Sequence, residues 1–296
     1  MRTLDKSKGI VIALGYFDSL HIGHRKVIKS AKTLAEKLNA HLMVFTFAGN
    51  LRATLNGQSE KYVYSLTERQ TLLTKMGVDS VYFAPISKDF LSLTREEFLD
   101  KINSEYRILG YVCGEDYRFG KNASGDVNTL IEYAKNNSQQ VEIVEKVCVE
   151  DEKVSTSLIK RLLGSGDIEK VNQLLGENYF IFGKVIHDRG VGKNLGFPTA
   201  NINIESQKQL LKSGVYSGKV LVDNCEYNAV INCGNRPTFS LDDVKVEAYL
   251  IGFNGDLYDK EIKIIFTRFI REIFKFNNRE ELINQLKKDV VSVGEK

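Results

Sequence analysis

The stretch IVIALGYFDSLHIGH, residues 10–24, decides the fold of the first half of the chain. Residues 10–14 form an apolar run of strand length, and a polar turn that contains Gly15 follows them. Apolar residues then recur at helical spacing from Val27 to Leu38. A strand, a glycine-containing turn and a helix start together form an anion site, because free backbone N–H groups and the helix dipole face the incoming charge.

The same alternation of short apolar runs and amphipathic segments continues to about residue 175. A helix opens at Thr67, where Glu68 stands in the first turn. We expect further strands at 41–47, 78–84, 108–113 and 141–147, and further helices at 95–106, 126–136, 158–163 and 168–175. This order predicts a parallel sheet with helices on both faces, and its ligand should lie at the carboxyl ends of the strands.

From about Tyr179 the pattern changes, because strand candidates follow one another with little helix between them. Turn signals such as Asn254-Gly255-Asp256 separate the strands. The candidates are 179–187, 215–223, 226–233, 245–253 and 261–270, before a helix at 279–289 with Asn278 as its N-cap. We therefore predict an α/β domain over residues 1–177 and an all-β domain, a small antiparallel barrel or sandwich, over residues 178–296.

Composition limits the class of protein. The chain has 296 residues, of which 43% are hydrophobic and 27% charged, which is the balance of a soluble globular protein and excludes disorder, collagen and a bare coiled coil. Neither a membrane span nor a signal peptide stands out, so we expect a cytoplasmic protein. The net charge of +3 is too small to indicate a nucleic-acid partner. The four cysteines form no CxxC pair, and we expect them to be reduced core residues.

Two histidines mark the first candidate site. His21 and His24 lie three positions apart around Gly23, at the start of the first helix. Imidazoles placed there can donate hydrogen bonds to phosphate oxygens and stabilise charge that builds during transfer between phosphates. The alternatives are two surface histidines at a capped helix, or a metal half-site that lacks a nearby third ligand.

Two further segments of the first half contain polar groups suited to a nucleotide. In the segment 114–120, aromatic faces can stack on a planar ring and Arg118 can bind phosphate, although a polar surface loop with one anchoring aromatic would look the same. In the segment 154–161, three hydroxyls precede a helix, where they either contact phosphate with Lys160 or simply cap the helix.

The second half contains a different set of groups. A glycine-rich loop at 190–196 can wrap a polyphosphate, and the oxygens of Thr199 and Asn201 are hard ligands that suit Mg²⁺. Glu247 stands in an apolar strand, and a carboxylate in a phosphate site can accept the proton of an attacking hydroxyl. A flexible hairpin loop and a solvent-facing carboxylate are the alternatives.

In this order the segments resemble the prokaryotic bifunctional riboflavin kinase/FAD synthetase family. Its patterns are GxFDGxHxGH, GxDFRFG and (I/V)SSTxIR in the first half, and GxVxHGxxxGRxLGFPTANI, GVYAG, NxGxxPTF and VExHxxDFxxxLY in the second. The resemblance implies a Rossmann-like nucleotidyltransferase domain with a parallel sheet, followed by a riboflavin kinase domain that is a small antiparallel β-barrel with a terminal helix. It implies that ATP phosphorylates riboflavin to FMN and then adenylylates FMN to FAD, releasing pyrophosphate.

The resemblance also assigns roles to residues. The catalytic residues are His21, His24 and Glu247. The ATP and phosphate ligands are Gly15, Phe17, Asp18, Gly23, Thr156, Ser157, Lys160, Gly190, Gly192, Lys193 and Gly196. Flavin binding is assigned to Asp116, Arg118, Phe119 and Arg271, and magnesium binding to Thr199 and Asn201. We expect Mg²⁺ to arrive with ATP, with no tightly bound metal, and we expect riboflavin, FMN, FAD and ATP as ligands, with no nucleic acid or membrane and the oligomeric state left open.

Several positions depart from the family patterns. Ser19 replaces a glycine, Thr156 and Ser157 exchange two hydroxyl types, and Lys160 replaces an arginine and loses its bidentate fork. The segment 47–51 reads FAGNL where relatives have an FxPHP-like stretch, so that its turn loses an imidazole and two prolines. We therefore expect adenylyl transfer to be the weaker activity. The alternatives are a riboflavin kinase with an inactive first domain, a flavin- or nucleotide-binding regulator without turnover, and an HxGH protein that acts on tRNA, which the mild charge opposes.

Overall fold

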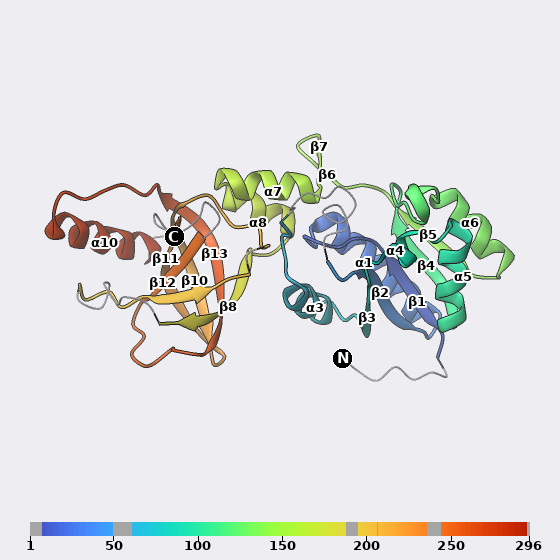
Figure 1. Ribbon diagram of the computed structural model, residues 1–296, viewed down its shortest axis with the longest axis horizontal. Helices are drawn as coiled ribbons and strands as arrows, with labels where there is room; N and C mark the ends of the chain where they lie inside the picture. Colours follow the sequence, from blue (N-terminus) through green and yellow to red (C-terminus); the bar gives the residue numbers. More distant parts are fainter. Residues whose placement is uncertain (1–7, 50–60, 188–194, 206, 236–243, 295–296) are drawn as a thin grey trace. The chain divides into compact units, whose positions relative to one another are not determined.

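The computed structural model describes residues 8–49, 61–187, 195–205, 207–235 and 244–294 (Figure 1). The chain divides into two compact units, residues 1–156 and 157–296. This division by packing falls earlier than the boundary at 177/178 that the sequence suggests for the two domains, and that boundary stays a prediction. Each unit is described by itself below.

The first unit is built on a five-stranded parallel sheet in the order β3-β2-β1-β4-β5. Every residue of the central strand β1 is buried, as expected for a parallel sheet covered on both faces. The order reverses between β1 and β4, and this is the switch point where such sheets bind ligands. The strands are β1 (Ile10–Leu14), β2 (His41–Phe47), β3 (Ser80–Ala84), β4 (Ile108–Gly114) and β5 (Gln140–Val144).

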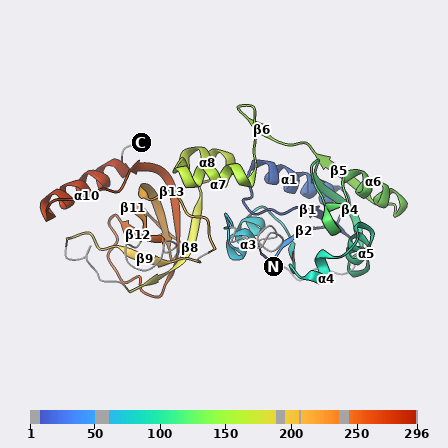
Figure 2. The ribbon, with the colours of Figure 1, turned by 45° about the horizontal axis from the view of Figure 1, so that its top comes forward.

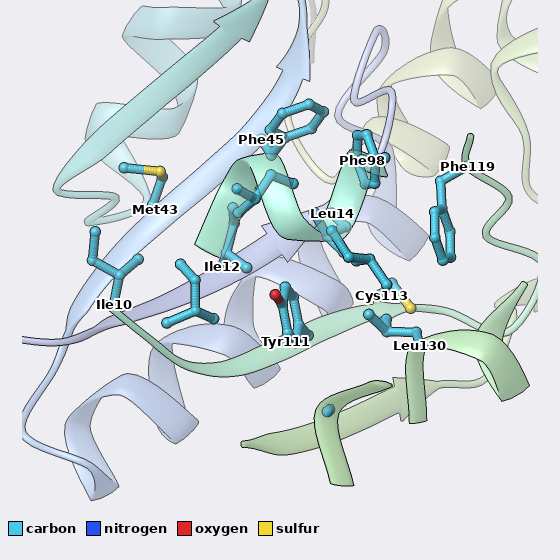
Figure 3. Close-up of a cluster of buried hydrophobic side chains, with 14 of the residues drawn as sticks. Ile10, Ile12, Leu14, Met43, Phe45, Phe98, Tyr111, Cys113, Phe119 and Leu130 are labelled. Carbon is cyan, nitrogen blue, oxygen red and sulfur yellow. The ribbon is translucent and has the colours of Figure 1, made fainter. Parts of the chain in front are cut away.

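Helices cover both faces of this sheet, as predicted. On one face, Leu34 of α1 approaches Gly110 of β4. On the other face, α5 and α6 contribute side chains to a cluster with Ile12 and Leu14 of β1 (Figure 3). The helices are α1 (Ile22–Lys37), α3 (Leu66–Lys75), α4 (Lys88–Leu91), α5 (Arg95–Glu105) and α6 (Val127–Asn136), with a 3₁₀ turn η1 (Lys121–Ala123) and a short hairpin β6 (Cys148–Val149) and β7 (Glu152–Lys153).

Helix α3 begins at Leu66, one residue before the predicted start. The reason is that Ser65 is the N-cap and forms a capping box with Glu68, so that the side chain of each accepts a backbone hydrogen bond at the other. An N-cap also decides the start of the predicted helix at 126–136. Asp126 is the N-cap, so the helix itself begins at Val127.

The second unit is a closed six-stranded antiparallel barrel in the order β10-β11-β12-β9-β8-β13, which decides between the barrel and the sandwich. Gly218 lies where two barrel strands approach closely, because a Cβ atom there would fall 2.1 Å from the Ile265 carbonyl oxygen. The strands are β8 (Phe180–Ile186), β9 (Ala200–Asn203), β10 (Gly214–Val222), β11 (Cys225–Asn235), β12 (Val244–Leu250) and β13 (Glu261–Arg271).

Within the described residues, three helices accompany the barrel. Helices α7 (Thr156–Ser165) and α8 (Ile168–Leu175) lie side by side (Figures 1 and 2). The Asn172 amide of α8 donates to the Phe266 carbonyl at 3.0 Å, which fixes α8 on strand β13. The terminal helix α10 (Arg279–Gly294) runs five residues beyond the predicted end, and Asn278 caps it as expected, since its Oδ1 accepts from Glu281 N at 2.8 Å.

The cysteines differ from the prediction in part. All four are free, but only Cys113 and Cys233 are buried, whereas Cys148 and Cys225 are exposed. Each exposed cysteine is the first residue of a strand, Cys148 of β6 and Cys225 of β11.

Candidate active sites

The first candidate site is the loop that connects β1 to α1, at the switch point of the sheet. Phe17 and Leu20 adopt left-handed φ values of 47° and 48°, a conformation that costs non-glycine residues roughly 1–3 kcal/mol each. The buried Phe17 ring folds back over Gly15, where a Cβ atom would lie 2.8 Å from the ring. Only glycine fits at position 15, so the loop has one compact arrangement that brings His21 to the N-cap of α1.

The two histidines of this loop are stacked. Their ring centroids lie 3.8 Å apart with an interplanar angle of 12°, and Phe17 meets the His24 ring edge-on at 5.2 Å. His21 Nδ1 accepts a hydrogen bond from the His24 backbone N–H at 3.2 Å, so the proton of a neutral His21 sits on Nε2. The geometry leaves Nε2–H of His21 as a donor.

Burial keeps both imidazoles neutral. It lowers the pKa of His21 to about 4, against a weaker opposing effect of the Asp116 carboxylate. It also lowers the pKa of His24 well below the ordinary histidine range, and the neighbouring His21 adds to this effect. Near neutral pH the pair therefore offers neutral N–H donors to a phosphate, rather than two positive charges.

The segment after β4 has its polar side chains engaged. Asp116 forms an ion pair with Lys153, and this contact holds the pKa of the Asp116 carboxyl below its usual range. Arg118 Nη1 forms an ion pair with Asp126 Oδ2 at 3.1 Å. Phe119 is only 5% exposed and belongs to the hydrophobic cluster of the sheet. The structure thus places Arg118 at the surface and the Phe119 ring in the core.

The loop after β1 contacts the segment 154–161 at the start of α7. Ser19 Oγ lies 3.0 Å from Thr156 Oγ1, at the start of α7. Ser157 is exposed and Lys160 is half-buried on the same helix. Asp18, by contrast, is buried, and its Oδ1 accepts from the Val63 backbone N–H at 2.9 Å. Asp18 therefore ties the loop to the chain before α3.

The second candidate site is a cavity of about 240 Å³ in the barrel unit. Glu247 of β12 stands opposite Asn201 of β9 and Asn232 of β11 in the strand register. Glu247 also forms an ion pair with Lys245, two residues earlier on the same strand. Polar and charged residues that line the cavity are Thr199, Asn232, Glu247, Tyr249, Arg271 and Asp289.

A buried amide oxygen belongs to Asn201, the strand partner of the cavity residue Glu247. Asn201 Oδ1 is buried and has no hydrogen-bond partner among the residues that the structure describes. A buried polar atom without a partner is costly, so a ligand is expected to satisfy it. Of the predicted phosphate loop, Gly190, Gly192 and Lys193 lie outside the described residues, and Gly196 stands just after the gap.

Arg271 lines the cavity but has its nitrogen atoms paired. Its Nε and Nη2 donate to Asp289 at 2.9 and 2.7 Å, and its Nη1 donates to the Glu272 carbonyl at 3.0 Å. The guanidinium also lies 4.8 Å from the centroid of the Phe274 ring. The carboxylate of Asp289, which the sequence analysis did not single out, is 1% exposed and connects α10 to β13.

Both halves of the chain match known protein families. The FAD synthetase family model matches residues 3–158, and the riboflavin kinase family model matches residues 175–295. The chain belongs to the bifunctional riboflavin kinase/FMN adenylyltransferase family. Bifunctional riboflavin kinase/FMN adenylyltransferases of Bacillus subtilis and Listeria monocytogenes are 35% and 34% identical to it, each over 94% of this chain and 90% of the relative. Both domains of the family are present, which supports the bifunctional interpretation over the kinase-only alternative.

A solved structure confirms the fold. The crystal structure of a macrolide-efflux protein from Streptococcus pneumoniae is 28% identical and has a TM-score of 0.90, covering 98% of this chain and 95% of its own.

Within the described ranges, no helix of this chain has the length and apolar character to span a membrane. Nor do the described residues include a group of three or more His, Cys, Asp or Glu side chains arranged to hold a metal ion.

Proposed function

We propose that this chain makes FAD from riboflavin in two ATP-dependent steps, one in each unit. The barrel unit phosphorylates the 5′-hydroxyl of riboflavin to give FMN and ADP. The sheet unit then transfers AMP from a second ATP onto the FMN phosphate and releases pyrophosphate. The observation that carries the proposal is the register of Glu247, which lines the cavity, with Asn201, whose buried amide oxygen has no hydrogen-bond partner within the described part of the chain.

In the kinase step, Glu247 acts as the general base. Its side chain is 24% exposed, so that the carboxylate is within reach of a bound hydroxyl while it stays fixed on strand β12. Accepting the hydroxyl proton as the oxygen attacks the γ-phosphorus of ATP is the role that a positioned carboxylate has in phosphoryl transfer. The aromatic residues Phe274 and Phe276, which line the same cavity, provide apolar surface for a flavin ring.

Thr199 and Asn201 fit the Mg²⁺ that accompanies ATP. A hydroxyl and an amide are oxygen donors of the kind that Mg²⁺ accepts, and the unpartnered Asn201 Oδ1 would be satisfied by such an ion. Mg²⁺ would neutralise charge on the ATP phosphates. The two residues are neutral, so the binding energy comes mostly from ATP, and both activities should stop on chelation with EDTA and return with added Mg²⁺.

In the adenylyl step, His21 and His24 donate hydrogen bonds to the phosphates of ATP. They are neutral and fixed by stacking, and preorganised donors of this kind stabilise the negative charge on the non-bridging oxygens of the α-phosphate and on the leaving pyrophosphate. No covalent intermediate with the protein is needed, because the FMN phosphate oxygen attacks the α-phosphorus directly and the bond to the β-phosphate oxygen breaks.

Product analysis tests the proposal. The purified chain is incubated with riboflavin, ATP and Mg²⁺, and flavins are separated by chromatography. FMN followed by FAD is expected, with one ADP per FMN and one pyrophosphate per FAD. FMN alone would leave only the kinase half of the proposal standing, and no turnover would favour a flavin- or nucleotide-binding regulator.

A further inference from the structure

The turn after β2 is held by side chains from two other elements. The hydroxyl of Tyr16, in the loop after β1, donates to the Gly49 carbonyl at 3.0 Å. In the opposite direction, Thr46 Oγ1 at the end of β2 donates to the Tyr16 carbonyl at 2.6 Å. The two loops that follow adjacent parallel strands are thus connected twice, at the edge of the sheet where a nucleotide is expected.

A buried arginine supports the same place from α3. Arg69 is 3% exposed, and its guanidinium donates to Thr46 Oγ1 at 3.3 Å and to the Phe47 carbonyl at 3.1 Å. It also lies 5.6 Å from the centroid of the Phe83 ring. Because an arginine is almost never this buried without partners, its contacts define its position and that of the Phe47 carbonyl.

We infer that Tyr16 and Arg69 are positioning residues for adenylyl transfer, an inference that rests on the proposed function of the sheet unit. This turn is where the family pattern has two prolines and a histidine, and the sequence of this chain has Gly49, Asn50 and Leu51 at those three positions. Prolines restrict a turn through their rings, whereas this chain restricts it through hydrogen bonds to the carbonyls of Phe47 and Gly49. Neither Tyr16 nor Arg69 takes part in a bond-making step.

The inference predicts how loss of one hydroxyl affects FAD synthesis. In Tyr16→Phe the ring stays and the hydrogen bond to the Gly49 carbonyl is lost. A typical net value for one such bond corresponds to a change of roughly 2- to 13-fold in an equilibrium constant. We expect KM for ATP in FAD synthesis to rise by about that factor while kcat changes little, because the turn is ordered when nucleotide binds. FMN formation should not change.

A second substitution tests whether the effect comes from order in the turn. Gly49 does not have a positive φ, and among the described residues a Cβ atom there would meet only the end of the Ile86 side chain, at 3.2 Å. Gly49→Ala therefore restricts the unbound turn at small steric cost, an effect of about two- to fivefold. In the Tyr16→Phe background it should lower the KM for ATP again. A residue that contacts the substrate directly would show no such rescue.

Controls separate the inference from folding and from the proposed function. Tyr133→Phe removes another hydroxyl of the same unit, which donates to Asp100 at 2.7 Å, and should leave FAD synthesis unchanged. Arg69→Lys keeps the charge but not the two-pronged contact, and should raise the KM for ATP as Tyr16→Phe does. If the unsubstituted enzyme makes no FAD, the proposed function and this positioning role are both wrong. If the unsubstituted enzyme makes FAD, two results would each overturn the positioning role alone. One is an unchanged KM for ATP in Tyr16→Phe, and the other is a raised KM that Gly49→Ala does not lower.

Discussion

Ser19 Oγ and Thr156 Oγ1 lie 3.0 Å apart although 137 positions separate them in the chain. Both positions depart from the family patterns, since Ser19 stands for a glycine and Thr156 for a serine. Ser19 is fully buried, so its hydroxyl depends on Thr156 for a partner, and the contact attaches the first residue of α7 to the histidine loop.

A double-mutant cycle should detect this coupling. Ser19→Ala and Thr156→Val each remove one hydroxyl, and each should lower kcat/KM for ATP in FAD synthesis. The double variant should lose less than the product of the two effects, by about 2- to 13-fold, because the second change removes a hydrogen bond already broken. FMN formation serves as the internal control. Strictly multiplicative losses would show that the two hydroxyls act independently.

Glu247→Gln should abolish FMN formation and leave conversion of FMN to FAD intact. The substitution keeps the shape of the side chain but removes its ability to accept a proton, a change worth roughly 10²–10⁴-fold in rate. Glu226→Gln is the matched control, because Glu226 is a carboxylate of the neighbouring strand β11 that pairs with Lys219 at the surface. Unchanged kinase turnover in Glu247→Gln would remove this residue from the mechanism.

FAD synthesis should show no histidine titration near neutral pH. Burial lowers the pKa of His21 to about 4 and lowers that of His24 well below its ordinary value, so both imidazoles are neutral near neutral pH. His24→Ala should lower the rate by roughly 10²–10³-fold near neutral pH, while FMN still appears. His41→Gln is the control, because His41 is the first residue of β2 and lies outside the histidine loop, so its substitution should leave FAD synthesis unchanged. An inflection near pH 6.5 that vanishes in His24→Ala would mean that a charged imidazole takes part.

The same buried pair gives stability a definite pH dependence. In the unfolded chain His21 titrates at its ordinary value near 6.5, above its folded value. The unfolded state therefore binds more protons than the folded state between about pH 6.5 and 4, so the free energy of unfolding falls as pH falls through that window, by ~3 kcal/mol from His21 alone. Urea unfolding of the parent and of His21→Gln at several pH values measures the difference.

Asp289 should be needed for a stable flavin pocket. It is the buried partner of Arg271, and removing one member of a buried pair costs roughly 3–5 kcal/mol. Asp289→Ala should therefore lower the urea concentration at which riboflavin kinase activity is lost, and raise the KM for riboflavin. Glu272→Gln, which removes an exposed partner of Lys212, should change neither. Equal behaviour of the two variants would show that the Arg271–Asp289 pair is dispensable.

The sequence predicted the regular elements well because they depend on local periodicity. The boundaries of β2 and α8 were correct to the residue, and the ends of other elements differed where a cap decided them, as Ser65 does for α3. Strand β9 was missed because four residues, ANIN, are too few to show an alternation. Its position follows from its pairing with β12 and β8, which are contacts between separate strands and not a local pattern.

The candidate sites divide in the same way. His21, His24 and Glu247 could be proposed because motifs mark them. Asp289 and Arg69 could not, since one is an ordinary acid in a helix of charged residues and the other an ordinary arginine after a helix cap. What distinguishes them is burial and partners from distant segments, such as Arg271 for Asp289, and no spacing in the sequence encodes that.

FMN should accumulate before FAD when the chain is given riboflavin and ATP. The segment 47–51 lacks the imidazole of the FxPHP-like stretch, and Lys160 binds a phosphate as a point charge without the bidentate geometry of arginine. The hydrogen bond from Tyr16 to Gly49 orders the turn but replaces neither group. Stopped time points should therefore show FMN rising first, with FAD following at a slower rate.

Restoring the family residues should reverse that order. The combined variant Gly49→Pro, Asn50→His, Leu51→Pro and Lys160→Arg supplies the imidazole, the rigid turn and the arginine fork together. It should raise the rate of FMN-to-FAD conversion and leave the rate of FMN formation unchanged, because all four positions lie in segments whose sequence we assign to the proposed adenylyl site. Lys160→Arg alone separates the phosphate contact from the turn. If the parent already converts FMN to FAD as fast as it makes FMN, these departures do not weaken the site, and the hydrogen bonds from Tyr16 and Arg69 suffice to hold the nucleotide loop.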